Sequence, residues 1–308
     1  MTAVEVKDLK RNYGKVEALK GISFKVPSGE IFGIIGPDGA GKTTLFRILT
    51  TLLLADSGSA VVDGDDVVKD FKSIRKKVGY MPGRFSLYQD LSVEENMKIF
   101  ASIFNTSIEE NYHLVKDIYS QIEPFKKRKA GALSGGMKQK LALSCALIHK
   151  PTVLFLDEPT TGVDPVSRKE FWDMLYKLKM QGITILVSTP YMDEASLCDR
   201  IALIQDGSFL KIDTPQNIVD QFENTLWSVH SNNMSKLLKD LRTNINISTC
   251  FAFGDTHHIT IKKDSLIENG GEFDQMNLRK FLEEKDHLEI DIKPIPAGIE
   301  DCFMELAG

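Results

Sequence analysis

A glycine-rich segment near the start of the chain has the residue types and spacing of a phosphate-binding loop. It reads Gly36-Pro-Asp-Gly-Ala-Gly-Lys-Thr-Thr and matches GxxxxGK[ST] between a buried-strand pattern and a helical pattern. Glycines let backbone N–H groups turn inward around phosphates, and the following helix N-terminus adds a favourable dipole. Lys42 would supply a cation to the β- and γ-phosphates, and Thr43 a hydroxyl ligand for Mg²⁺. The segment predicts a site for ATP and Mg²⁺; a chance glycine-rich turn is the alternative.

Two acidic residues follow a second apolar run. Val153-Leu-Phe-Leu ends at Asp157 and Glu158, as a strand ending in a Walker B pair would. Asp157 is expected to hold Mg²⁺ through water, and Glu158 to polarise the attacking water. An acidic pair after a strand also suits a solvated turn, so this prediction depends on the phosphate-binding loop.

A Ser-Gly-Gly turn lies between these two motifs. The segment Leu133-Ser-Gly-Gly-Met-Lys-Gln places Ser134, Gly135 and Gly136 at the start of a helical pattern. Such a turn can bind an anion at a helix N-terminus or serve as an ordinary helix cap. In this position it resembles the LSGGQ signature of ABC ATPases, and the resemblance extends from Val4 to about Phe222.

The resemblance implies further site residues. Asp164 resembles the D-loop residue of the family, and Tyr13 lies where such ATPases stack an aromatic ring on adenine; a core or surface tyrosine is the alternative. The catalytic residue would be Glu158, and the metal ligands Thr43 and Asp157. The nucleotide-binding residues would be Tyr13, Gly36, Pro37, Asp38, Gly39, Ala40, Gly41, Lys42, Thr43, Thr44, Ser134, Gly135, Gly136 and Asp164.

Two positions depart from the family pattern. Gly83 stands where the family has a glutamine that ligates Mg²⁺ and senses the γ-phosphate, and Pro190 stands where it has a histidine. Glycine has no side chain to offer, and proline has neither a side-chain donor nor a backbone N–H. Losing one such contact typically costs about 10²–10³ in rate. The sequence therefore predicts a site that binds ATP and hydrolyses it slowly.

Compensation by other side chains is the alternative to a weakened site. The residues near enough in sequence to replace the missing contacts are Ser188, Thr189, Tyr191 and Gln89.

The elements that position these motifs have the pattern of an α/β P-loop NTPase domain, predicted over residues 1–223. Continuous apolar runs are typical of strands buried on both faces of a largely parallel sheet. The predicted strands are Ile31–Ile35, Val153–Leu156, Ile183–Val187 and Ile201–Ile204, and the predicted helices are Thr43–Leu54, Met137–His149 and Ser167–Met180.

Residues 224–308 have a different pattern and are predicted to form a small α+β module. The order βαββαβ suggests a ferredoxin-like fold. Its predicted strands and helices are Leu226–Val229, Met234–Leu241, Ile245–Phe253, His258–Lys262, Leu278–Glu284 and a last strand with Leu288, Ile290 and Ile292 alternating.

Composition limits the class of protein. The chain has 308 residues and a formal net charge of −5, without the basic excess of a nucleic-acid binder. Its four cysteines form no CxxC pair, which favours a reduced cytosolic protein over a zinc or redox site. No signal peptide or membrane-spanning run is evident.

The resemblance implies an ATP-binding subunit of an ABC transporter at the cytoplasmic face of the cell membrane. Its partners would be a membrane permease and a second nucleotide-binding domain, with no nucleic acid. The ending Ala297-Gly-Ile-Glu-Asp-Cys-Phe-Met-Glu-Leu resembles exporters of drugs, lipids or polysaccharides. A soluble non-transport ABC protein and a regulatory nucleotide-binding protein are the alternatives.

Overall fold

The chain consists of two compact units in a computed structural model that describes residues 1–262 and 274–308. The first unit is Met1–Pro215 and the second is Gln216–Gly308, whereas the sequence pattern changes later, at 223/224. Helix α7 (Pro215–Asp220) belongs largely to the second unit because it contacts α10 (Ile299–Ala307) there. The Cys302 Sγ atom of α10 lies 3.7 Å from the carbonyl oxygen of Ile218 in α7.

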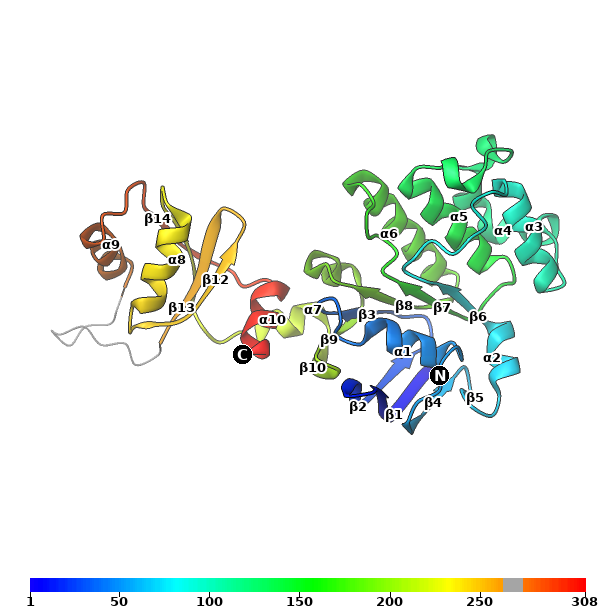
Figure 1. Cartoon of the computed structure of the whole chain (residues 1–308), viewed down its shortest axis with the longest axis horizontal. Helices are drawn as coiled ribbons and strands as arrows, with labels where there is room; N and C mark the ends of the chain where they lie inside the picture. The colour runs from blue at the N-terminus through cyan, green and yellow to red at the C-terminus, as the bar shows by residue number, and fades with distance from the viewer. Residues whose placement is uncertain (263–273) are drawn as a thin grey trace. The chain divides into compact units, whose positions relative to one another are not determined.

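A six-stranded sheet forms the centre of the first unit (Figure 1). Its strand order is β10-β9-β3-β8-β7-β6, and all neighbours pair in parallel except β10, which is antiparallel at one edge. The largely parallel sheet predicted from the apolar runs is confirmed. The strands are β3 (Ile31–Ile35), β6 (Val78–Met81), β7 (Val153–Asp157), β8 (Thr184–Thr189), β9 (Arg200–Gln205) and β10 (Ser208–Asp213).

A second, antiparallel sheet belongs to the same unit. Its order is β2-β1-β4-β5, and β1 carries irregular pairing near Asp8, which has a φ of 45°. The strands are β1 (Thr2–Tyr13), β2 (Val16–Pro27), β4 (Ser57–Val62) and β5 (Asp65–Asp66).

Helix α1 (Lys42–Leu49) packs between the two sheets (Figure 1). Its Phe46 ring meets Phe155 of β7 edge to face at 5.6 Å, and both side chains are fully buried. Full burial of an apolar side chain of this size contributes about 1.5–3 kcal/mol. The core therefore fixes the helix that follows the phosphate-binding loop.

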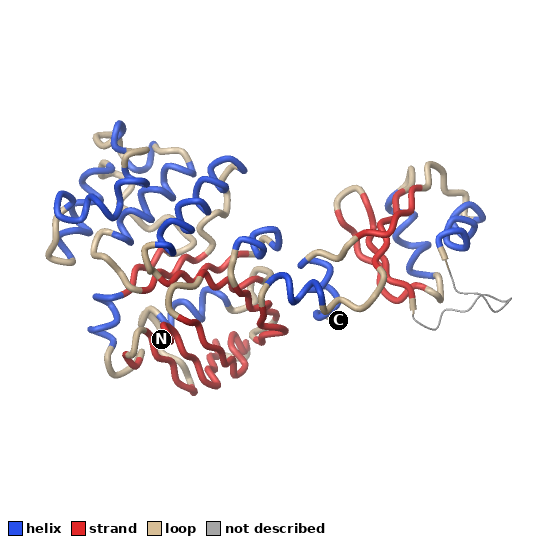
Figure 2. Tube along the Cα trace, turned by 180° about the vertical axis from the view of Figure 1, so that it is seen from behind, coloured by secondary structure: helices blue, strands red, loops and turns tan. Residues whose placement is uncertain are grey.

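Most of the remaining helices of the first unit gather on the other side of the parallel sheet (Figure 2). The exception is α2 (Phe71–Lys77), which contacts β5 and β6 and whose Ile74 belongs to the same core as α1. Helix α5 contacts β6 and helix α6 contacts β8. The elements are α2 (Phe71–Lys77), α3 (Val93–Ile103), α4 (Ile108–Tyr119), η1 (Glu123–Phe125), η2 (Ala130–Ala132), α5 (Gly135–Leu147), α6 (Pro165–Met180) and η3 (Met192–Leu197). Within the described ranges, every helix is too short or too polar to cross a bilayer.

The predicted helix Thr43–Leu54 is wrong at its C-terminal end. Helix α1 stops at Leu49, and Thr51 adopts a left-handed φ of 62°. The backbone N–H and the buried hydroxyl of Thr50 both donate to the carbonyl oxygen of Phe46 at the end of the helix. Leu52 and Leu54 are exposed, so they extend the apolar pattern without belonging to a buried helix face.

The second unit has the predicted βαββαβ order. Its antiparallel sheet has the strand order β12-β13-β11-β14, and one face packs on α8 and α9 around a separate core. The elements are β11 (Leu226–His230), α8 (Met234–Thr243), β12 (Ile247–Phe253), β13 (Thr256–Ile261), α9 (Gln275–Glu284), β14 (Asp291–Ile295) and α10.

The last strand begins later than predicted. Strand β14 starts at Asp291, because Glu289 is left-handed with a φ of 54° and breaks the extended run. Leu288, which the alternation predicts as a strand residue, is exposed.

Candidate nucleotide site

The phosphate-binding loop connects β3 to α1, as predicted. Gly41 caps the helix with a φ of 105°, which strongly favours glycine. A Cβ atom at Gly36 would lie 2.1 Å from the carbonyl oxygen of Ile204 in β9, so no side chain fits there. Backbone geometry and packing therefore both require glycine in this loop.

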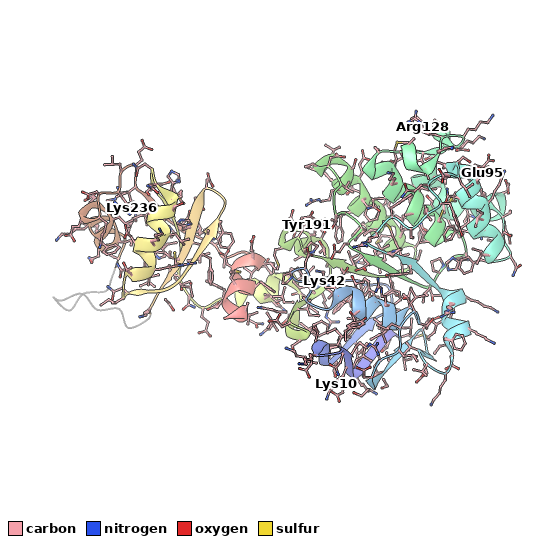
Figure 3. All side chains as sticks on the ribbon, viewed as in Figure 1. Lys10, Lys42, Glu95, Arg128, Tyr191 and Lys236 are labelled. Atoms are coloured by element: carbon pink, nitrogen blue, oxygen red, sulfur yellow. The ribbon has the colours of Figure 1, made fainter. Side chains whose placement is uncertain are left out.

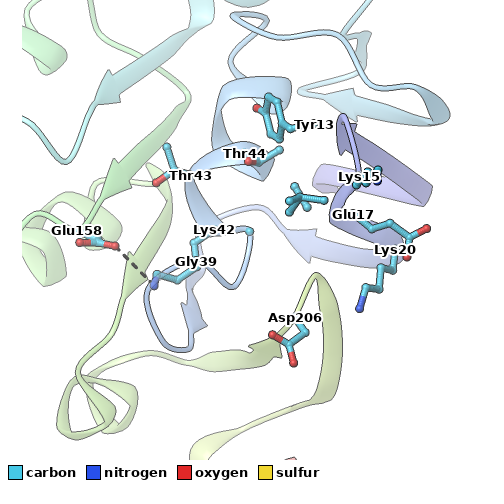
Figure 4. Close-up of a pocket in the computed structure, with 13 residues that line it drawn as sticks. Tyr13, Lys15, Glu17, Lys20, Gly39, Lys42, Thr43, Thr44, Glu158 and Asp206 are labelled. Carbon is cyan, nitrogen blue, oxygen red and sulfur yellow. Dashed lines mark ion pairs between the residues drawn. The ribbon is translucent and has the colours of Figure 1, made fainter.

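The Lys42 ammonium is buried and held at the loop. Its Nζ atom donates to the carbonyl oxygens of Gly36 at 2.7 Å and Pro37 at 2.9 Å. It also lies 3.5 Å from the Glu158 carboxylate, the ion pair drawn as a dashed line in Figure 4. A cation in this place can bind phosphate oxygens that enter the loop.

A cavity of about 550 Å³ lies over the loop (Figure 4). Of the predicted site residues, it is lined by Tyr13, Gly39, Gly41, Lys42, Thr43, Thr44 and Glu158. Tyr13 is 44% exposed, and its ring lies 5.1 Å from the Arg11 guanidinium. Gly36, Pro37, Asp38 and Ala40 form the loop without lining this cavity.

The acidic pair lies at the end of β7, next to β8. Asp157 is buried and accepts a hydrogen bond of 2.6 Å from the Ser188 hydroxyl. Burial and the negative charge of Asp157 raise the pKa of Tyr80 to about 12. Glu158 adopts a left-handed φ of 50°, and its backbone N–H donates to Ser188. Its carboxylate points toward Lys42 and the Thr161 hydroxyl.

Thr43 and Asp157 are suited to Mg²⁺, because a hydroxyl and a carboxylate are hard oxygen donors. Figure 4 shows the Thr43 side chain directed toward the side of the cavity that Glu158 occupies. A bound Mg²⁺ supplies charge neutralisation for phosphate oxygens. Further ligands would come from the nucleotide and water.

The two departures from the family pattern lie at the edge of this site. A Cβ atom at Gly83 would be 3.0 Å from the carbonyl oxygen of Asp157, so position 83 adjoins the acidic pair. Pro190 directly follows β8, and the Tyr191 N–H next to it donates to the Thr189 hydroxyl. The Tyr191 ring lies 4.2 Å from the Arg168 guanidinium, and Figure 3 shows where this tyrosine and Lys42 lie in the first unit.

The signature residues Ser134, Gly135 and Gly136 do not line this cavity. Ser134 caps α5 by accepting from the Met137 N–H, and Gly135 and Gly136 begin the helix. Asp164 caps α6, where a hydrogen bond from the Ser167 N–H lowers the pKa of its carboxyl group. Among the described residues that line the cavity, none belongs to these two motifs.

Sequence reasoning missed part of the cavity wall. A hairpin turn at Asp206 and Gly207 joins β9 to β10, and the Asp206 side chain lines the cavity. The Gly207 N–H donates to the carbonyl of Ala40, and its own carbonyl accepts from the Lys20 N–H. An Asp-Gly pair between apolar runs predicts such a hairpin, but not that it contacts the phosphate-binding loop. The other missed lining residues are Lys15, Val16, Glu17, Ala18 and Lys20.

A strand, a glycine-rich loop with a buried lysine and an acidic pair at the end of another strand of the same parallel sheet together define a P-loop nucleotide-binding protein. Residues 19–161 match the model of the ABC transporter family. A probable multidrug ABC transporter ATP-binding protein, YbhF of Escherichia coli, is 37% identical over 288 residues, covering 92% of the chain and 48% of YbhF. The chain thus spans about half the length of that relative.

Another relative matches over nearly its whole length. The Nod factor export ATP-binding protein I of Burkholderia thailandensis is 34% identical and is covered to 97%, with 99% of the chain aligned. A solved dimeric structure of the ATP-binding cassette MJ0796, bound to ADP and Pi, is 25% identical with a TM-score of 0.62, covering 68% of the chain and 98% of the cassette. The chain belongs to the ABC transporter family of ATP-binding proteins.

Proposed function

We propose that the chain is the ATP-binding subunit of an ABC-type exporter and acts at the cytoplasmic face of a membrane. It would couple ATP binding and hydrolysis to a membrane permease, together with a second nucleotide-binding domain. The names of its relatives support this proposal, since they describe multidrug and Nod factor export. The cofactors would be ATP and Mg²⁺.

The chain's own site is proposed to bind ATP and to hydrolyse it slowly. The observation that supports this is the contrast between an intact phosphate-binding loop and the two departures beside it, Gly83 and Pro190. Two of the four side chains named as alternatives have other partners: the Ser188 hydroxyl binds Asp157, and the Tyr191 ring lies against Arg168.

The signature is proposed to complete the nucleotide site of the partner domain. Ser134, Gly135 and Gly136 keep the geometry of an anion-binding helix start, yet they do not line the cavity of their own chain. The dimeric cassette bound to ADP and Pi shows that a relative assembles in pairs. Hydrolysis in the assembled transporter would then occur mostly at the partner's phosphate-binding loop.

Purification from detergent-solubilised membranes tests the proposal. The tagged chain should elute with a multi-helix membrane protein in a stoichiometric complex that hydrolyses ATP. Elution with ribosomes or DNA would support a soluble non-transport ABC protein. A chain that elutes alone and never hydrolyses ATP would support a regulatory nucleotide-binding protein.

A further inference from the structure

Ser188 lies beside both acidic residues of the nucleotide site. It is the last residue but one of β8, and the strand register pairs it with Asp157 of β7. Partners in neighbouring parallel strands direct their side chains to the same face of the sheet. Ser188 is completely buried, and Asp157 is only 2% exposed. The hydroxyl and the carboxylate therefore meet out of contact with bulk water.

One hydroxyl group contacts two functional residues. The Ser188 Oγ atom donates to Asp157 Oδ1 at 2.6 Å and accepts from the Glu158 N–H at 3.1 Å. The first distance is in the range of charge-assisted O–H···O⁻ hydrogen bonds, which are about twice as strong as neutral ones. Within the described part of the chain, no other hydrogen bond to the Asp157 carboxylate is present.

The backbone of Glu158 depends on the same residue. Its φ of 50° lies in the left-handed region, which is unfavourable for a residue other than glycine and persists only where the surroundings hold it. The Glu158 N–H is shared between the Ser188 hydroxyl and the Ser188 carbonyl oxygen, at 3.1 Å and 3.0 Å. This backbone conformation directs the Glu158 carboxylate toward Lys42.

We propose that Ser188 is a positioning residue that orients the Asp157 carboxylate for Mg²⁺ and holds the Glu158 backbone beside it. Ser188 thus serves as a structural partner of the acidic pair and not as a substitute for a missing γ-phosphate contact. Partners that orient a metal-binding carboxylate typically change metal affinity by about 10–100-fold when they are removed. The inference rests on the proposed ATP and Mg²⁺ site.

Titration of the full chain with a fluorescent ATP analogue, in EDTA and at increasing Mg²⁺ concentration, tests this role. In EDTA, Ser188→Ala should bind the nucleotide within about twofold of the unchanged chain, because Lys42 and the loop are intact. The Mg²⁺ concentration that gives half of the Mg²⁺-dependent gain in affinity should rise about tenfold or more. Ser188→Thr keeps the hydroxyl and should restore most of the Mg²⁺ response.

Ser144→Ala is the matched control. Ser144 is also completely buried and its hydroxyl donates to the carbonyl of Lys140 in α5, away from the acidic pair. Thermal unfolding checks that each variant is folded; should the extra methyl of Ser188→Thr prevent folding, Ser188→Cys retains the size and a weak donor. An unchanged Mg²⁺ response in Ser188→Ala, or an equal loss in Ser144→Ala, would overturn the inference. Absence of nucleotide binding by the unchanged chain would instead overturn the proposed function.

Discussion

Two regions of the proposed nucleotide site differ in how many of the expected functional groups they contain. The phosphate cradle, residues 36–44, has the glycines, the lysine and the hydroxyl that a nucleotide needs. The proposed γ-phosphate edge consists of Gly83 and Pro190, and the family resemblance implies that two side chains are missing there. If the chain binds ATP but hydrolyses it slowly, as we propose, then binding and hydrolysis depend on separate groups of residues.

The largest effect is expected in the phosphate cradle. Lys42→Ala should weaken ATP affinity by about 100-fold or more, since charge-assisted hydrogen bonds to phosphate contribute about 1.5–3 kcal/mol each. Calorimetry with ATP and Mg²⁺ measures the loss. The exposed Lys177→Ala on α6 is the control and should bind like the unchanged chain. Equal affinities for Lys42→Ala and the control would show that the cradle is not the nucleotide site.

The next largest effect distinguishes ATP hydrolysis at the chain's own site from hydrolysis at the partner's site, which the signature would complete. In the assembled transporter, Gly135→Asp should abolish ATPase activity, because a carboxylate would face the partner's γ-phosphate at the start of α5. A Cβ atom at this position would lie 3.3 Å from the carbonyl oxygen of Gly162, so the helix start needs to move only slightly.

Glu158→Gln is the comparison variant for that experiment. It removes a base from a site that already lacks two contacts, so it should leave much of the activity. Assays in nanodiscs compare the two variants. If Glu158→Gln proves the more damaging, the chain's own site performs the chemistry and the proposal of a weakened site is wrong.

A smaller effect, on the hydrolysis rate, is expected from introducing the family's glutamine and histidine at positions 83 and 190. Gly83→Gln with Pro190→His should raise the hydrolysis rate of the chain about tenfold, less than the 10²–10³ of an established contact. The new side chain at position 83 must displace the Asp157 carbonyl oxygen by a few tenths of an ångström, which limits the gain. Steady-state phosphate release measures it. A turnover near 10 s⁻¹, the median of enzymes, in the unchanged chain would show that other groups compensate.

The smallest effect is expected from removing the second unit. Residues 1–215 should bind ATP with unchanged affinity, since the cavity is lined by residues of the first unit alone among those described. A longer chain of residues 1–223 keeps α7 but loses α10 and its contact with the Ile218 carbonyl oxygen, so it should be less soluble. Aggregation of the 1–215 chain, or loss of its ATP binding, would show that the second unit is structurally required.

The sequence predicts the phosphate-binding loop and the strand before the acidic pair well, because short, local patterns determine them. The loop, its helix start and the strand before the acidic pair are each contained in fewer than ten residues. Strands β1 and β2 are harder to predict, because the irregular pairing near Asp8 shifts the buried positions from Val6 to Leu9 and breaks the alternation. The contact of Gly207 with Ala40 joins residues far apart in sequence and has no local pattern.

The contacts of α10 have a consequence for the order in which the protein is completed during synthesis. Asp301 pairs with His258 at 2.7 Å, and Glu305 accepts a hydrogen bond from Asn224 near the start of the second unit. The first unit can close once Pro215 has left the ribosome, whereas the second waits for α10. At about 5–20 residues per second this interval lasts roughly 5–20 s. For most of that time the ATP-binding unit is folded while the α8–α9 core, whose last buried residue is Ile292, remains open to chaperones and proteases.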